Sequence, residues 1–256
     1  MNPRRGAILR EMGLTPVWRR RGPAPSAGDA DPPRRIETGP TDARGVDAGP
    51  AMATGEEMDR AALIARMDWQ QLRDGVSGCR ACRLCERRKQ AVLGVGDLEP
   101  QVLFVGEGPG AEEDERGEPF VGQAGKLLDA MLGSIGLARG KGVYIANTVK
   151  CRPPENRTPQ ADEMAACFPF LRRQIALLRP KLMVALGRPA AQALLDTEVK
   201  IGAARGREFA YDGIPLLVTY HPAYLLRNLP DKARAWEDLC LIRRLLAGDD
   251  PATGAD

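Results

Sequence analysis

Four short apolar runs occur from residue 102 onward, at residues 102–105, 143–146, 182–186 and 216–219, the last of which ends in Thr219. Runs of this length, bounded by glycine or polar residues, predict strands that are buried on both faces. Segments with apolar residues at helical spacing alternate with them and predict helices at residues 56–74, 125–137, 161–178, 189–195 and 233–246. We therefore predict an α/β fold, a three-layer α/β/α sandwich around a mostly parallel four-stranded sheet.

The first 56 residues differ in composition from the rest of the chain. Proline and glycine recur every few positions, and short arginine runs occur at residues 19–21 and 34–35. Apolar residues are too few there to offset the entropy of ordering the chain. We predict a disordered tail at residues 1–56, a folded domain at residues 57–248 and a short flexible tail at residues 249–256. An alternative role for the first tail is that of an arm whose arginines hold nucleic acid.

Composition and charge exclude several classes of protein. The 256 residues carry 37 Lys+Arg against 34 Asp+Glu, which excludes a histone-like protein. The chain has one histidine, His221, which excludes sites that need two imidazoles, such as HExxH zinc proteases. No segment approaches 18 consecutive apolar residues, and the start lacks the apolar core of a secretory signal. We expect a cytoplasmic protein that does not enter a membrane.

The six cysteines suggest a metal site. Cys79, Cys82 and Cys85 are separated by two residues each, and Cys151 and Cys167 follow later in the chain. Four thiolates suit either a structural zinc ion or a [4Fe–4S] cluster. The fifteen residues between Cys151 and Cys167 make a poor zinc knuckle, so the spacing favours an iron–sulfur cluster. Buried thiols or a redox pair are the other interpretations.

Distinctive residues follow the predicted strands, where open parallel sheets bind their ligands. A Gly-Glu-Gly-Pro-Gly turn at residues 106–110 offers backbone amides beside a carboxylate, but lacks the lysine of a phosphate loop. We expect the acidic residues 112–115 to lie in a solvated loop. Asn147 ends the second strand, where its amide either matches the edge of a nucleobase or caps its own turn.

His221 follows the fourth predicted strand. A histidine at a strand end beside a loop is more often functional than structural. The next residues include Leu225 and Leu226, which we expect to be exposed, and then Arg227. Leucines in a loop suit a wedge that enters a base stack, while an arginine holds phosphate.

Taken together, the segments GCRAC, VLFVGEGPG, GEPFVGQAGKLLD, NTVKCRPPENRTP and HPAYLLR resemble, in this order, the iron–sulfur members (family 4) of the uracil-DNA glycosylase superfamily. The resemblance covers about residues 68–246. It implies a three-layer fold and the hydrolysis of the N-glycosidic bond of uracil in DNA, which leaves an abasic site for base excision repair. An alternative is an iron–sulfur module of the same fold that binds DNA lesions without cutting.

The resemblance also implies roles for individual residues. The sets are a uracil pocket of Gly106, Glu107, Gly108, Phe120, Asn147 and His221; a catalytic pair of His221 and Glu107; a DNA-entering loop of Leu225, Leu226 and Arg227; and a [4Fe–4S] cluster held by Cys79, Cys82, Cys151 and Cys167. Cys85 falls outside the matched positions and is expected to be a bystander. The implied partner is uracil-containing DNA, single- or double-stranded, bound by a nucleoid-associated monomer whose tail recruits a replication or repair protein.

The chain departs from better-known relatives at two positions of the first motif. Gly108 stands where those relatives carry the aspartate that orients the attacking water, which leaves Glu107 as the candidate base. Gly110 stands where they exclude thymine with a tyrosine, so we expect another residue, Glu113, to take that role. A covalent-trapping relative has a second histidine, which this chain lacks.

Overall fold

The computed structural model of the protein describes residues 55–248, with side chains from residue 59 onward. Residues 1–54 and 249–256, on which most of the predicted tails fall, lie outside the described residues. The described strands are β1 (Val95–Gly96), β2 (Val102–Gly106), β3 (Val143–Asn147), β4 (Leu182–Leu186), β5 (Glu208–Tyr211) and β6 (Ile214–Thr219). The described α-helices are α2 (Gly55–Arg66), α3 (Trp69–Ser77), α4 (Ala111–Arg116), α5 (Gln123–Ser134), α6 (Ala161–Leu178), α7 (Arg188–Leu195), α8 (Ile201–Ala204), α9 (Pro222–Arg227) and α10 (Lys232–Ala247). Short 3-10 turns are η1 (Arg83–Glu86), η2 (Pro154–Asn156) and η3 (Leu229–Asp231).

The strands form one sheet in the order β1-β3-β2-β4-β6-β5. The four central strands are mutually parallel, and the two edge strands pair antiparallel with their neighbours. The register pairs Gly106 of β2 with Asn147 of β3, and Leu186 of β4 with Thr219 of β6. The carboxyl ends of the central strands therefore meet along one edge of the sheet.

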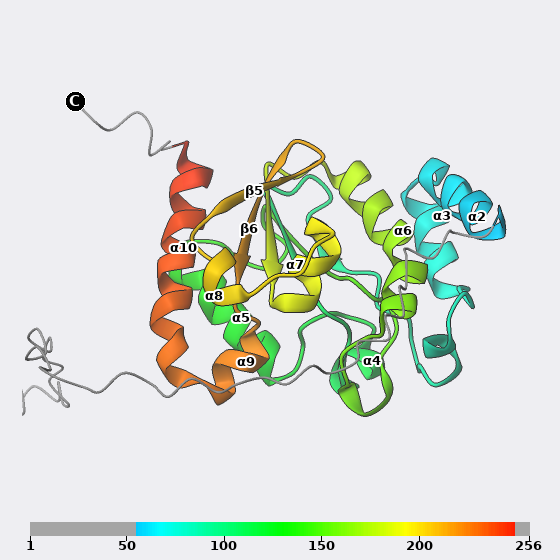
Figure 1. Ribbon diagram of the computed structural model, residues 1–256, viewed down its shortest axis with the longest axis horizontal. Coiled ribbons are helices and arrows are strands. Elements are labelled where there is room, and N and C mark those ends of the chain that lie inside the picture. The colour runs from blue at the N-terminus through cyan, green and yellow to red at the C-terminus, as the bar shows by residue number, and fades with distance from the viewer. Residues whose placement is uncertain (1–54, 249–256) are drawn as a thin grey trace, which may run out of the picture. The chain divides into compact units, whose positions relative to one another are not determined.

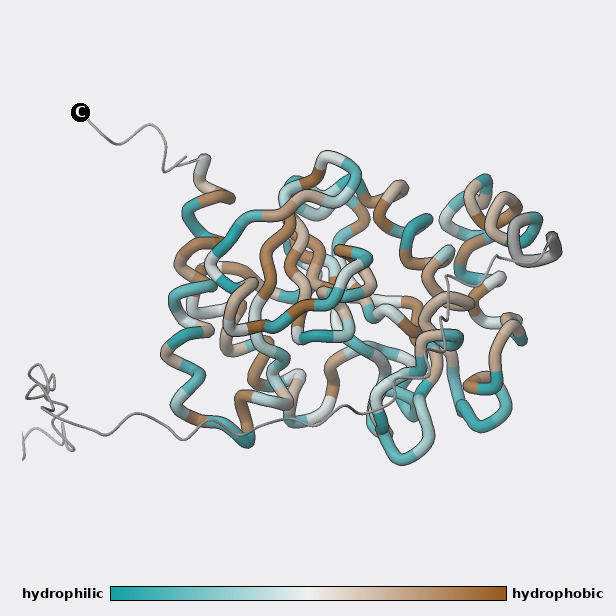
Figure 2. The backbone as a smooth tube through the Cα atoms, in the orientation of Figure 1, coloured by the Kyte–Doolittle hydropathy of each residue, from teal (hydrophilic) through white to brown (hydrophobic). Residues whose placement is uncertain are grey.

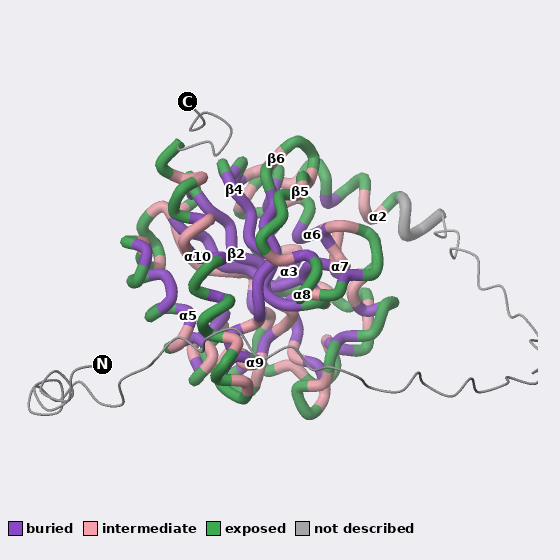
Figure 3. The backbone as a smooth tube through the Cα atoms, turned by 60° about the vertical axis from the view of Figure 1, so that its left-hand side comes forward, coloured by how far each residue is buried: buried purple, intermediate pink, exposed green. Residues whose placement is uncertain are grey.

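Helices cover both faces of the sheet, because alternate strand residues point to opposite sides. On one face, Val102 and Phe104 of β2 share a buried core with residues of α5, α9 and α10. On the other face, Leu103 and Val105 share a core with residues of α6 and α7. The central strands run between these helices in Figure 1 and are the most hydrophobic part of the chain in Figure 2. Figure 3 shows them buried beneath the outer turns of the helices.

The predicted α/β class is confirmed, but the predicted strand number of four is wrong. The missed strands are the edges, β1 and β5. β1 has only two residues, and β5 alternates exposed and half-buried positions, so neither has the continuous apolar run that identifies a central strand. Among the described helices, none is long and apolar enough to cross a bilayer.

Local polar contacts correct two further predictions. The single helix expected at residues 56–74 is two helices, because the Asp68 side chain accepts a hydrogen bond from the Gln71 amide and starts α3 anew. The acidic segment expected as a solvated loop is helix α4. Its Asp114 is buried and accepts a hydrogen bond from the Lys89 backbone N–H at 2.9 Å.

Candidate active site

A cleft of about 920 Å³ opens at the carboxyl ends of the central strands. Among the residues predicted for the site, its walls include Glu107, Gly108, Phe120, Asn147, His221 and Arg227. Gly106 lies directly behind two of them, because a Cβ atom there would come within 2.5 Å of Asn147 Oδ1 and 2.6 Å of Phe120 Cζ. A side chain at position 106 would therefore displace both neighbours.

Asn147 presents an unused hydrogen-bond acceptor. The residue is 1% exposed, and its Oδ1 is a buried atom without a hydrogen-bond partner. Its main chain is held firmly, by the β2–β3 pairing and by Lys150 Nζ, which donates to its carbonyl oxygen at 2.8 Å. A buried acceptor without a partner costs about 1–3 kcal/mol. Such an atom beside a cleft indicates a ligand that donates a hydrogen bond.

Phe120 is held at the cleft wall by its backbone. It adopts a positive φ of 55°, which is uncommon for a bulky residue. Arg139 donates to the carbonyl oxygens of Pro119 and Phe120 at 2.8 and 2.7 Å. On the other side, the Phe120 carbonyl lies where a Cβ atom of Gly125 in α5 would stand, only 1.7 Å away. The strained conformation is thus fixed from two directions.

Glu113 connects the first loop of the cleft to the loop that carries Phe120. Its carboxylate accepts hydrogen bonds from the backbone N–H groups of Gly110, Val121 and Gly122, at 3.1, 2.9 and 3.0 Å. The side chain also lines the cleft. This positioning role was not predicted from the sequence, although an acidic residue three positions after the N-cap residue of a helix is a capping signal.

His221 is positioned as a neutral hydrogen-bond donor. Its Nδ1 accepts the backbone N–H of Ala223 at 3.1 Å, at the start of α9, which leaves the proton of a neutral imidazole on Nε2. Burial and, to a lesser extent, the nearby Arg227 lower its pKa to about 4, against the opposing effect of Glu113. The ring lies 5.4 Å from that of Phe120, tilted by 31°. Both rings therefore belong to the same part of the cleft.

Glu107 is the other titratable candidate of the predicted site. Burial raises the pKa of its carboxyl, and the Thr158 hydroxyl and the Arg188 guanidinium oppose the shift. Its carbonyl oxygen accepts the Val149 amide at 3.2 Å, which joins the first loop to the end of β3. A carboxylate with a raised pKa is a stronger base than one in water.

The predicted DNA-entering loop is a short helix, α9, and its two leucines differ. Leu225 is 1% exposed and belongs to the core under the sheet, so the expectation that it is exposed is wrong. Leu226 is 41% exposed, and Arg227 is exposed as well. Leu229, just beyond α9, is 61% exposed and was not predicted. The apolar positions available at this rim are therefore 226 and 229.

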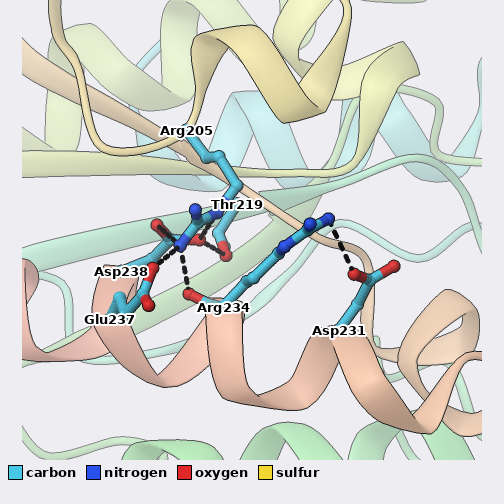
Figure 4. Close-up of polar contacts among 6 residues, drawn as sticks. All are labelled: Arg205, Thr219, Asp231, Arg234, Glu237 and Asp238. Carbon is cyan, nitrogen blue, oxygen red and sulfur yellow. Dashed lines mark hydrogen bonds and ion pairs between the residues drawn. The ribbon is translucent and has the colours of Figure 1, made fainter. Parts of the chain in front are cut away.

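A buried polar network supports the strand that leads to His221. The Thr219 hydroxyl donates to Asp238 Oδ2 of α10 at 2.6 Å, and Arg205 Nε donates to the same oxygen at 3.2 Å. Arg205 Nη2 lies 3.0 Å from Asp238 Oδ1, an ion pair without hydrogen-bond alignment. Figure 4 shows Arg205 reaching across to α10, where it also meets Glu237. The network ties the end of β6 to the last helix.

The cysteines predicted as ligands lie around one small cavity. Cys79 and Cys82 come from the segment after α3, Cys151 follows β3, and Cys167 lies in α6. Cys85, which we expect to be a bystander, lines the same cavity. Within residues 59–248, no three Cys, His, Asp or Glu side chains converge to hold a single metal ion. The five cysteines therefore line one shared cavity.

Burial makes three of the thiols, those of Cys82, Cys151 and Cys167, harder to ionise. It raises the pKa of Cys82 and Cys151, and raises that of Cys167 to about 12. The Arg88 guanidinium opposes the shift at Cys151. Lys150 lies between the cavity and the cleft: its backbone N–H donates to Cys167 Sγ at 3.3 Å, and its ammonium group bonds the Asn147 carbonyl. The cysteine cavity and the cleft therefore share a short segment of chain.

Comparison with known proteins agrees with this geometry. The profile of the uracil DNA glycosylase superfamily matches residues 93–240. A type-4 uracil-DNA glycosylase from Pyrobaculum aerophilum is 43% identical over 185 residues, which cover 68% of this chain and 93% of the relative. One from Thermotoga maritima is 47% identical over 161 residues, covering 62% and 83%. A type-5 uracil-DNA glycosylase from Thermus thermophilus is 34% identical over 180 residues, covering 55% and 82%. The chain therefore belongs to the uracil-DNA glycosylase superfamily, and within it to the type-4 group.

Proposed function

We propose that the protein is a uracil-DNA glycosylase, which hydrolyses the bond between uracil and deoxyribose in DNA and leaves an abasic site. The observation that carries this proposal is the unpartnered Oδ1 of Asn147 at the wall of a cleft that also holds Phe120 and His221. The substrate base must leave the duplex stack to reach such a cleft. In a short or single-stranded substrate, moving the base into the cleft costs less free energy, because less pairing and stacking is lost.

Asn147 and Phe120 select the base. The Oδ1 of Asn147 accepts a hydrogen bond from N3–H of uracil, and its amide N–H donates to O4. Cytosine presents an unprotonated N3 and an amino group at these positions, so it leaves the asparagine unsatisfied. Phe120 provides an aromatic surface that replaces the stacking lost when the base leaves the duplex.

His221 stabilises the leaving group. Cleavage of the glycosidic bond places negative charge on O2 of uracil. A neutral imidazole stabilises this charge by donating a hydrogen bond from its Nε2–H to O2. The low pKa of His221 keeps the imidazole neutral over the whole physiological range.

Glu107 and Glu113 take the roles that the two glycines at positions 108 and 110 leave open. Glu107, with its raised pKa, accepts a proton from the attacking water. The N-glycosidic bond breaks ahead of the attack by water, so the water needs little activation by a base. Glu113 is fixed by three backbone N–H groups at the same end of the cleft, and its side chain fills the space that the 5-methyl group of thymine would enter.

The cysteine cavity suits a [4Fe–4S] cluster held by Cys79, Cys82, Cys151 and Cys167. A zinc ion needs all four sulfurs at about 2.3 Å from one point, whereas a cluster spreads its ligands over four iron atoms. The cysteines line one cavity, and the fifteen residues between Cys151 and Cys167 make a poor zinc knuckle, which together support the second interpretation. When bound, the cluster cross-links α3, β3 and α6 and adds a redox-active centre.

The test is uracil release from an oligonucleotide that contains a single deoxyuridine. Wild-type protein should produce the abasic product, and His221→Ala should lower the rate by roughly 10²–10³, as for loss of an oxyanion donor. Iron and sulfide analysis of the same preparation tests the cluster. Binding of the oligonucleotide without release by wild-type protein would refute the enzyme and favour a lesion-binding module.

A further inference from the structure

Two arginines, Arg88 in the wall of the cysteine cavity and Arg60 beside it, donate hydrogen bonds to its sulfurs. Arg88 Nη1 lies 2.9 Å from Cys151 Sγ, and its Nη2 donates to the carbonyl oxygen of Ser77, the last residue of α3, at 2.5 Å. The planar guanidinium thus bridges the end of a helix and a sulfur in a fixed geometry.

Arg60 makes the corresponding contact at another cysteine. Its Nη2 lies 3.5 Å from Cys79 Sγ, and its Nη1 donates to the carbonyl oxygen of Ala166 at 2.8 Å. The guanidinium also stacks over the ring of Phe170, at 5.0 Å from the centroid. Ala166 and Phe170 both line the cavity, so Arg60 is fixed to the cavity wall.

Neither arginine is engaged by a carboxylate among the described side chains of residues 59–248. A guanidinium is always charged and has no acceptor atoms, so a partly buried one requires a partner with negative charge or lone pairs. Here the partners are sulfur atoms and backbone carbonyls. Four thiolates around a [4Fe–4S] core carry a net negative charge, which would balance these two cations.

We propose that Arg60 and Arg88 are positioning residues of the cysteine site, which orient Cys79 and Cys151 through hydrogen bonds to their sulfurs, slow the loss of the cluster and raise its reduction potential. The proposal rests on the proposed cluster. Hydrogen bonds to ligand sulfurs and nearby positive charge both favour the reduced, more negative state of an iron–sulfur centre. Outer-shell partners of metal ligands commonly change metal retention by about 10–100-fold.

The experiment compares Arg88→Gln, Arg88→Lys and Arg60→Gln with the wild-type holoprotein. Two quantities are measured: the rate at which a chelator bleaches the visible absorbance of the cluster, and the midpoint potential in a mediated titration with dithionite. Arg66→Gln, at the end of the helix that carries Arg60, and Arg83→Gln, at the start of η1, serve as controls, because both arginines are exposed and neither makes one of the described hydrogen bonds to sulfur. Thermal unfolding confirms that each variant is folded.

We expect Arg88→Gln and Arg60→Gln to lose the cluster about 10-fold faster and to have lower potentials, by about 59 mV for each tenfold change in redox preference. Arg88→Lys should keep the reduction potential, because lysine retains the positive charge. It should lose the cluster faster, because an ammonium group cannot bridge Cys151 Sγ and the Ser77 carbonyl as the planar guanidinium does. The controls should match wild type. Unchanged release and potential in both glutamine variants would overturn the proposal. If one of them fails to fold, the other and Arg88→Lys decide. Wild-type protein without iron would refute the cluster itself and leave the uracil-release assay to judge the enzyme separately.

Discussion

At the scale of single residues, the cleft combines two polar groups that are costly to the folded protein. Asn147 keeps a buried acceptor without a partner, and His221 is buried as the neutral imidazole, in surroundings that disfavour its protonated form. Both features are unfavourable until a base binds, because they leave interactions to be completed by the ligand. Each one therefore links stability and activity in a measurable way.

The first prediction concerns the protonation of His221. Its pKa is about 4 in the folded protein, against the ordinary histidine value of 6.5 in the unfolded chain. Between these values the unfolded chain binds more protons, so this residue contributes stability above pH 6.5 that is lost as the pH falls toward 4. His221→Asn retains an acceptor for the Ala223 N–H but cannot titrate. Urea unfolding at pH 7 and pH 5 should show a smaller loss of stability for the variant than for wild type, and an equal loss would contradict the low pKa.

The second prediction concerns Asn147. Asn147→Ala removes two hydrogen bonds to the base, worth about 1 kcal/mol each, and should lower uracil release by roughly 30-fold. It also removes the unpartnered acceptor, so the melting temperature should stay near that of wild type despite a deletion in a buried position. Inhibition by free uracil, measured in the same assay, should weaken in parallel. A large fall in melting temperature with undiminished inhibition by uracil would show that the residue is structural.

At the scale of elements, the loop that carries Phe120 depends on α5. Gly125 lies in the first turn of that helix, where the Phe120 carbonyl occupies the space of a side chain. Gly133 lies in the last turn of the same helix and has no atom near the position of a Cβ. Helix α5 therefore contains one glycine without room for a side chain, Gly125, and one with room, Gly133.

The third prediction compares these two positions. Gly125→Ala must push the Phe120 loop away and should lower uracil release at least 10-fold, together with the melting temperature. Gly133→Ala should retain activity and gain about 0.5–1 kcal/mol, because alanine favours a helix. Thermal unfolding and single-turnover uracil release provide both readouts. Normal activity of Gly125→Ala would mean that the loop does not need its close contact with α5.

The sequence predicts those elements whose signal is local. β2, β4 and α6 have continuous apolar runs or a long helical period, and they lie where the pattern places them. The edge strands, by contrast, are defined by pairing with neighbours distant in sequence, and the break between α2 and α3 by one side-chain hydrogen bond. Leu225 and Leu226 are adjacent and chemically identical, so only the orientation of α9 distinguishes the buried one from the exposed one.

At the scale of the whole molecule, the sheet gathers cleft residues from segments more than a hundred positions apart. Residues at strand ends, such as Asn147 and His221, could be predicted to meet there, since parallel strands end at one edge. The residues that hold them in place could not. Arg139 and Asp238 act through contacts that only the folded chain brings together, and neither has a sequence pattern that distinguishes it from other surface charges.

Asp238 and Glu237 test how far this supporting structure extends. The two residues are adjacent on α10, and each forms an ion pair with Arg205. The side chain of Asp238 is 3% exposed, whereas that of Glu237 is 68% exposed. Asp238 also accepts the Thr219 hydroxyl, two residues before His221. Removing the buried partner leaves Arg205, itself only 14% exposed, with the exposed carboxylate alone.

The fourth prediction follows from this contrast. Asp238→Ala should lower the free energy of unfolding by about 3–5 kcal/mol, as for a buried ion pair that loses one partner. Glu237→Ala should cost at most about 1 kcal/mol, the usual value of an exposed pair. Because the strand that Asp238 holds carries His221 at its end, Asp238→Ala should also slow single-turnover uracil release under conditions where the variant remains folded, while Glu237→Ala should not. Equal losses of stability in the two variants would show that the network does not stabilise the end of β6, and that α10 holds His221 in place through its apolar contacts alone.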